Sequence, residues 1–260
     1  MRLHKMCRRF FQEVICVSKV KLSVISTWHY VKLVFRSLMF LAGLTVYILH
    51  RRSGTGEAGL ARYAPVLIFL WVMYAISMTL RFFPSPTESM GCQKQFARNY
   101  KPIPAGKHGF VQPRKHGTMM AAASWVVLNG LIGLIYFLGW IDKGILMLIS
   151  LAYGVCDMIC ILFFCPFQTW MMKNKCCNTC RIYNWDYAMM FTPMLFIGGF
   201  WAWSLLGMSL VLMARWEITF FRHPERFLEA CNDSLACRNC QEKLCSHKKQ
   251  LQHLLKELKR

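Results

Sequence analysis

The chain has 260 residues, of which 55% are apolar, and its 32 Lys and Arg against 12 Asp and Glu produce a formal net charge of +20. The apolar residues form blocks of about 20, the length that a helix needs to cross the hydrocarbon core of a bilayer, which excludes an ordinary soluble domain. The basic residues lie between these blocks, where anionic lipid headgroups attract them. Because no recognition motif for DNA or RNA accompanies them, we expect no nucleic-acid partner.

Residues 1–27 are predicted to form a basic amphipathic helix. No short apolar core is followed by a small-residue cleavage site, so we do not expect a cleavable signal peptide. Apolar residues recur at the i, i+3, i+4, i+7 spacing of a helical face, and basic residues take the other face. Such a helix lies on a membrane surface or packs on a partner protein. The apolar face consists of Leu3, Met6, Cys7, Phe10, Phe11, Val14 and Ile15.

A transmembrane bundle is predicted over residues 28–216. Arg36, close to the start of the first apolar block, is expected to extend outward to water. Pro84 ends the second block and begins a basic loop. The turn at 142–144 is short, so the third and fourth blocks should be antiparallel neighbours. We predict five transmembrane helices, at about 31–49, 63–83, 118–140, 144–167 and 187–214.

Residues 217–260 form a basic, cysteine-rich tail. Leu251, Leu254, Leu255 and Leu258 make an apolar stripe that predicts a second surface-lying or pairing helix. The expected fold is therefore all-α: a multi-pass integral protein of the cell membrane, with amphipathic surface helices at both termini. We expect the bilayer as its main partner, with a membrane-protein partner or a second copy of the chain as further candidates.

The distribution of Lys and Arg does not predict a consistent orientation of this bundle in the membrane. Lys and Arg are richest in the N-terminal segment and in the 84–117 and 168–186 loops, which predicts that this side is cytoplasmic. Five spans would then place the basic tail on the opposite side, which the same rule disfavours. A fifth segment that turns back at Gly198–Gly199 would remove the conflict.

Six of the 13 cysteines lie between Cys156 and Cys180, and a first candidate site follows the fourth span. A C-x2-C turn presents two sulfurs to one metal ion, and an adjacent cysteine can add a third thiolate. The same turn can instead hold a redox pair or a disulfide, with Cys177 and Cys180 as the pair, or simple thiols. The candidate ligands are Cys165, Cys176, Cys177 and Cys180.

A second candidate site lies in the tail. Its pattern, C-x5-C-x2-C-x4-C-x-H, provides four thiolates, or three with the histidine, for a tetrahedral metal ion in a short polar segment. Two disulfides would staple the same segment if the tail were outside the cell, and a third alternative is that the cysteines do neither. The candidate ligands are Cys231, Cys237, Cys240, Cys245 and His247. Zinc or an iron–sulfur cluster is the expected cofactor at both sites.

Asp157 lies near the middle of the fourth predicted span. A carboxylate in the bilayer is costly unless it is protonated or paired. Cys156 and Cys160 lie close to it on the same helix, and Asn129 lies midway along the third span. These four residues could coordinate an ion or relay a proton. Alternatively, they form interhelical hydrogen bonds that hold the two helices together.

We therefore predict a membrane protein with thiolate metal sites at the membrane surface, in a structural or sensing role. One alternative is a membrane thiol–disulfide oxidoreductase that uses Cys177 and Cys180, with an apolar pocket of quinone size between its spans. Another is an ion or soft-metal transporter with a site at Asp157. The chain contains no P-loop, G-x-S-x-G or G-x-G-x-x-G motif, so no catalytic residue is predicted.

Overall fold

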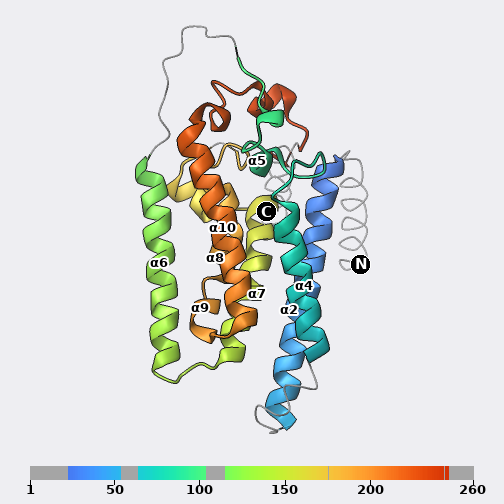
Figure 1. The fold of residues 1–260 in the computed structure, drawn as a ribbon, viewed down its shortest axis with the longest axis vertical. Coiled ribbons are helices and arrows are strands. Elements are labelled where there is room, and N and C mark those ends of the chain that lie inside the picture. Colours follow the sequence, from blue (N-terminus) through green and yellow to red (C-terminus); the bar gives the residue numbers. More distant parts are fainter. Residues whose placement is uncertain (1–22, 54–63, 104–114, 175, 243, 246–260) are drawn as a thin grey trace, which may run out of the picture.

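The computed structural model describes residues 23–53, 64–103, 115–174, 176–242 and 244–245 (Figure 1). Most of the predicted N-terminal amphipathic helix, the leucine-striped helix of the tail and His247 lie outside these residues. The described chain is helical. Within it, the strand-like pairing is limited to one isolated bridge between Pro102 and Asn232.

Four helices are long and apolar enough to cross a membrane: α2 (Val24–Ser53), α6 (Lys115–Phe137), α7 (Lys143–Leu162) and α10 (Phe200–Arg222). They indicate a multi-pass membrane protein. A fifth apolar helix, α4 (Ala64–Leu80), is shorter at 17 residues. The expected turn before α7 is present, and Asp142 begins the helix by accepting a hydrogen bond from the Ile145 amide at 2.9 Å.

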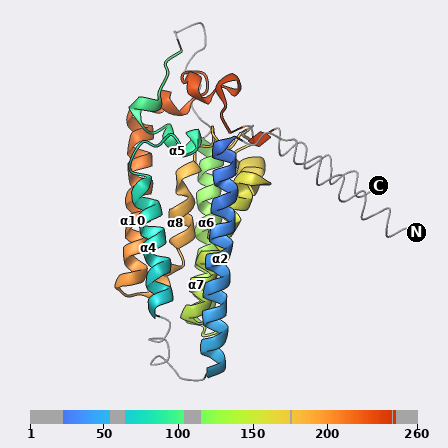
Figure 2. The same ribbon diagram turned by 90° about the vertical axis from the view of Figure 1, so that its right-hand side faces the viewer.

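The bundle is built around the pair α2 and α7, which lie side by side (Figures 1 and 2). Gly43 of α2 permits this approach, because a Cβ atom there would lie 2.7 Å from Leu151 Cδ1. Helix α6 stands at one edge of the bundle in Figure 1, and its closest packing is with the π-helical turn η3 (Phe167–Met171) rather than with α7. The third and fourth blocks are therefore consecutive without being tightly packed neighbours.

The segment expected as one span at 187–214 is divided in two. Helices α8 (Asp186–Phe191) and α9 (Met194–Ile197) lead to Gly198 and Gly199, whose φ angles of 74° and 85° suit glycine. Helix α10 then runs back: the Trp203 indole donates to Leu195 O, whereas near the other end Glu217 pairs with Arg181. The chain after α10 consequently returns to the end of the bundle where α8 begins (Figure 1).

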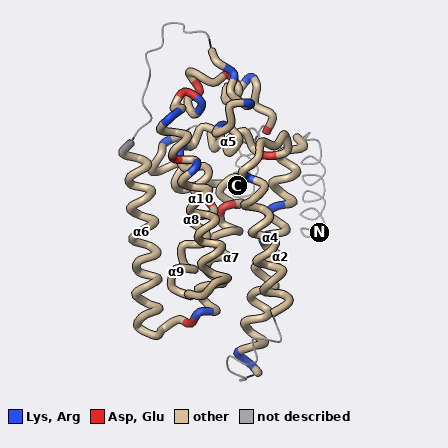
Figure 3. The backbone as a smooth tube through the Cα atoms, viewed as in Figure 1, with Lys and Arg blue, Asp and Glu red and all other residues tan. Residues whose placement is uncertain are grey.

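Charged residues gather at that end of the bundle (Figure 3). There, short helices and turns form a layer that we call the cap, comprising the described residues of 81–103, 163–185 and 223–245. It includes α5 (Met90–Gln93), η2 (Ala97–Asn99), η4 (Tyr183–Trp185), η5 (Pro224–Phe227), η6 (Asp233–Leu235) and η7 (Cys237–Asn239). Large apolar side chains such as Val126 and Phe137 are exposed along α6, as lipid-facing residues would be.

Candidate functional site

The two cysteine-rich segments meet in the cap. Because α10 returns the chain, the tail lies against the segment that follows η3. Cys176 and Cys177 from the first segment and Cys240 and Cys245 from the second line one small cavity of about 40 Å³. The thiols of Cys176 and Cys245 are in hydrogen-bonding contact, and burial raises the pKa of Cys176 to about 12. We call these four residues the joint cysteine cluster.

Glu242 fixes the tail in this position. Its Oε1 accepts hydrogen bonds from Ser89 Oγ at 2.8 Å and from the Met90 amide at 3.1 Å, both at the start of α5. Its backbone carbonyl accepts a hydrogen bond from Ser26 Oγ of α2, and His29 Nε2 lies 3.6 Å from its Oε2. Glu242 is 3% exposed, so the tail is held by a buried carboxylate with several donors.

The remaining predicted ligands lie elsewhere. Cys231 is near the Pro102–Asn232 bridge, where its carbonyl accepts a hydrogen bond from the Ile103 amide. Cys237 begins the exposed turn η7. Neither residue lines the small cavity of the joint cysteine cluster. Within the ranges that the structure describes, no group of three or more His, Cys, Asp or Glu side chains has a geometry that could hold a metal ion as it stands.

A larger cavity of about 300 Å³ lies between α6, α7 and α8 and shares Cys177 with the joint cysteine cluster. Its walls are mainly apolar and aromatic, with Trp125 from α6 and Tyr153 from α7 4.8 Å apart between ring centroids. Five cysteines line it: Cys156, Cys160, Cys165, Cys177 and Cys180. We call it the thiol cavity. The sequence indicated the residue types but not this convergence, because α6 and the cap contribute from distant parts of the chain.

Asp157 is paired with a buried arginine. Arg36 Nη1 lies 2.6 Å from Asp157 Oδ2 and also donates to the Gly154 carbonyl at 2.9 Å. Arg36 is 5% exposed, so the prediction that it extends outward to water is wrong. Asn129 donates to the Trp125 carbonyl of its own helix. The carboxylate that the transporter alternative assigned to an ion thus has a cation of the protein beside it.

A second buried pair joins α8 to the end of α4. Arg81 donates to Asp186 Oδ1 at 2.8 Å and to Asn184 Oδ1 at 3.3 Å. The guanidinium groups of Arg81 and Arg36 lie over the same ring, that of Tyr187, at 4.5 and 5.4 Å from its centroid. One aromatic side chain therefore separates two ion pairs inside the bundle. This network was not predicted, because the spacing of single charges in the sequence does not reveal their partners.

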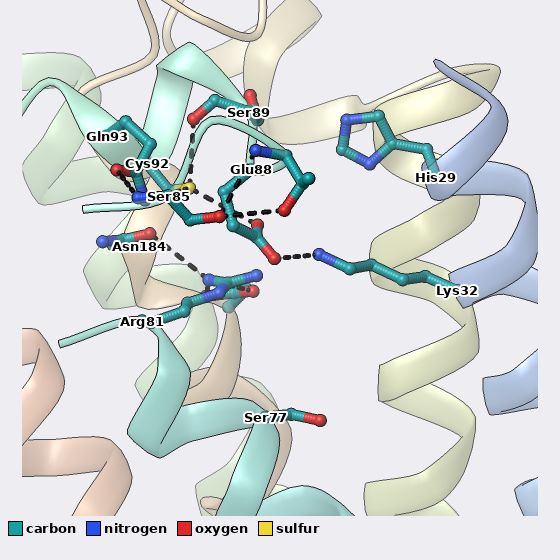
Figure 4. A network of polar contacts seen from close by, with 12 residues as sticks. His29, Lys32, Ser77, Arg81, Ser85, Glu88, Ser89, Cys92, Gln93 and Asn184 are labelled. Atoms are coloured by element: carbon teal, nitrogen blue, oxygen red, sulfur yellow. Dashed lines mark hydrogen bonds and ion pairs between the residues drawn. The ribbon is translucent and has the colours of Figure 1, made fainter. Parts of the chain in front are cut away.

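The network continues into the cap (Figure 4). Lys32 of α2 pairs with Glu88, and the Cys92 thiol donates to the Ser89 carbonyl at 3.1 Å. Burial acts to raise the pKa of Glu88, but Arg81 and Lys32 outweigh it and hold that pKa below its usual value. Glu88 is therefore ionised at neutral pH, and it ties α2 to the cap.

Lys94 is a fully buried amine at the centre of the cap. Its Nζ donates to the carbonyls of Asn178 at 2.9 Å and Cys180 at 2.8 Å, and it lies 5.1 Å from the centroid of the Trp216 ring. Burial lowers its pKa from 10.5 to about 7, although the carbonyls and the ring favour the charged form. The hydrogen bonds of Lys94 connect the segment of Cys176–Cys180 to α5.

The Lys94 pKa predicts a pH-dependent stability. Between about pH 7 and 10.5 the unfolded chain keeps a proton on Lys94 that the folded protein releases, so stability should rise with pH across this window. Relative to a Lys94→Met variant, we expect the wild type to gain on the order of a few kcal/mol as pH rises through this window. Thermal unfolding in mild detergent from pH 6.5 to 9 checks this. A Lys101→Met control, at an exposed site, should parallel the wild type. A constant difference between wild type and Lys94→Met would contradict it.

Comparisons of the chain with protein-family models, curated proteins and solved structures found no match. The functional assignment therefore depends on the geometry of the thiols and of the buried charges.

Proposed function

We propose that this multi-pass membrane protein binds one metal ion through the joint cysteine cluster, in a structural or sensing role at the membrane surface. The observation that carries the proposal is the meeting of two cysteine-rich segments, remote in sequence, around one small cavity. The sequence predicted two separate metal sites, one in each segment. The single site proposed here takes two ligands from the segment after η3, Cys176 and Cys177, and two from the tail, Cys240 and Cys245.

Zinc is the metal that this ligand set suits best. Four thiolates satisfy tetrahedral Zn²⁺ at about 2.3 Å per bond, and soft sulfur ligands select zinc or iron over the hard cations. Cys176 and Cys245 are already in thiol contact. Cys177 and Cys240 line the same cavity, and their thiols would have to move toward that pair to complete the site. Because the ligands come from two segments, metal binding would stabilise the docking of the tail on the bundle.

The charge distribution supports a metal rather than disulfides. The cysteines of both segments lie at the charged end of the bundle, where Lys and Arg are abundant (Figure 3). A Lys- and Arg-rich end is typical of the cytoplasmic side of a membrane protein, and cytosolic thiols are kept reduced. The reversal at Gly198–Gly199 brings the described part of the tail, within 223–245, to this same end, which supports one common side for the basic segments.

Elemental analysis of protein purified anaerobically in mild detergent tests the proposal. We expect about one zinc ion per chain. A Cys176→Ser/Cys240→Ser variant should lose it, because each substitution removes a ligand from a different segment. The matched control is Cys231→Ser/Cys237→Ser, which alters two tail cysteines outside the cavity and should keep the metal.

Two results would contradict the joint site. Loss of metal in the Cys231→Ser/Cys237→Ser control would show that the ligands all come from the tail. A metal-free protein with a Cys176–Cys245 disulfide, seen by mass spectrometry, would replace the metal with a covalent link. If the protein lacked zinc and absorbed broadly near 400 nm, the same four cysteines would be assigned to an iron–sulfur cluster.

A further inference from the structure

We propose that the thiol cavity binds a lipid-soluble quinone, and that Cys160 and Cys165 are a dithiol that the quinone oxidises. This activity goes beyond metal binding and uses different cysteines. The C-x2-C spacing in the sequence favours Cys177 and Cys180 as a redox pair. The structure assigns the role to another pair, which lies where α7 ends.

Cys160 and Cys165 are held together as a pair. Cys160 is in the last turn of α7, and Cys165 follows just after that helix ends, so that their thiols are in hydrogen-bonding contact. The Cys165 sulfur also accepts a hydrogen bond from the Gln168 amide at 3.3 Å. An N–H donor stabilises a thiolate more than a thiol, which makes Cys165 the better nucleophile of the two. Both residues line the thiol cavity.

The pair at Cys177 and Cys180 is engaged in other contacts. The Cys177 thiol donates to Gln168 Oε1 at 2.9 Å, and Cys177 also belongs to the joint cysteine cluster. Cys180 is buried, and its carbonyl accepts from Lys94. Their C-x2-C turn therefore contributes to the cap and to the wall of the cavity.

The cavity suits a flat, apolar ring. Its volume of about 300 Å³ is at the lower end of ligand sites, large enough for a substituted ring with part of a tail. Aromatic side chains from α6, α7, η3 and η4 line it: Trp125, Tyr153, Phe167 and Tyr183. Offset aromatic packing favours a planar guest over a lone acyl chain. Helix α6 lines one side of the cavity and stands at the edge of the bundle, where a ligand from the lipid would meet it.

The charges of the wall favour an uncharged ligand. The carboxylates that reach the cavity are those of Asp157 and Asp186, and each is paired with a buried arginine, Arg36 or Arg81. A charged ligand would find no free counter-ion among these groups and would have to give up its hydration. A quinone has no net charge, and its carbonyl oxygens can accept hydrogen bonds from thiols.

The reaction balances with the quinone as the oxidant. The Cys160 and Cys165 S–H bonds break and one S–S bond forms between the two sulfurs. Two electrons pass to the quinone ring, and its two carbonyl oxygens each take one proton, so that one quinol leaves. The reverse reaction, from quinol and disulfide, uses the same atoms.

A fully substituted benzoquinone tests the proposal, because its ring has no free position to which a thiol could add. Anaerobic, fully reduced protein in detergent is mixed with this quinone. We expect one quinol formed for two thiols lost, and a Cys160–Cys165 disulfide in the peptide map. Cys160→Ala and Cys165→Ala should each slow quinol formation by at least about tenfold. Cys231→Ala and Cys237→Ala change thiols that do not line this cavity and should retain the rate.

Several outcomes would overturn the assignment. One is a disulfide between Cys177 and Cys180, and another is an unchanged rate in Cys160→Ala. An equal loss of rate in all four variants would show that the reaction is not specific to this pair. Zinc content measured on the same samples separates this proposal from the metal site, because Cys160→Ala leaves all four residues of the joint cysteine cluster in place.

Discussion

Replacing Asp157 with Asn is expected to destabilise the protein by about 3–5 kcal/mol, because it leaves the buried Arg36 guanidinium without its counter-charge. Arg36 is 5% exposed and its Nη1 lies 2.6 Å from Asp157 Oδ2. The nearby Arg81 would add to this destabilisation. Its guanidinium group lies over the same Tyr187 ring as that of Arg36, and the variant has one carboxylate fewer to balance the two positive charges.

A double variant separates pairing from packing. Arg36→Met/Asp157→Leu removes both charges and keeps apolar side chains in the space, so its stability should return close to that of the wild type. Thermal unfolding in mild detergent, followed by tryptophan fluorescence, measures all of these variants. Equal stability of Asp157→Asn and the wild type would mean that the pair is not formed in the membrane protein. It would also reopen Asp157 as an ion site.

Trp216→Ala is the second large change, with an expected cost of about 3–5 kcal/mol. Trp216 of α10 is fully buried, and its indole donates to the Arg181 carbonyl at 2.9 Å. Its ring meets Phe227 edge-on at 4.7 Å between centroids and lies beneath the Lys94 amine. Truncation therefore leaves a cavity and an unpaired carbonyl in the cap, and it removes the ring that packs against the Lys94 amine.

The same substitution should weaken metal binding, because Trp216 joins α10 to both segments that supply the thiols. We expect a lower melting temperature together with loss of zinc in Trp216→Ala. Trp203→Ala is the control on the same helix: Trp203 is 57% exposed, and its loss should change both quantities little. Retention of zinc in an unfolded-like Trp216→Ala protein would show that the joint cysteine cluster forms without the cap.

Local sequence predicted the long apolar helices α2, α6 and α7, but it did not predict that the 187–214 segment is divided. Blocks of apolar residues predict membrane helices because each residue adds its own transfer free energy, and every backbone group is satisfied within the same segment. Asp142 predicted the turn before α7 for an equally local reason, since its side chain accepts from an amide three residues on. Helix α7 ends at Leu162, five residues before the expected boundary at Phe167. The π-helical turn η3 begins at Phe167, directly after Pro166.

The path after α9 was decided by tertiary structure. Two glycines permit a reversal at Gly198–Gly199, but a straight, tilted span was equally compatible with the same residues. The returning path is stabilised by contacts that no local pattern reveals, such as the Arg181–Glu217 ion pair and the packing of α10 on α4 and α8.

The sequence by itself determined that the chain is helical, that it has membrane-spanning character and that its thiols fall in two segments. Only the tertiary structure decided that these segments share one cavity, that Arg36 turns inward to Asp157, and that Cys160 contacts Cys165. The physical reason is the separation in sequence of the residues that interact. Hydrophobic length and turn chemistry act between near neighbours in the chain, whereas ion pairs and thiol contacts depend on which distant helices pack together.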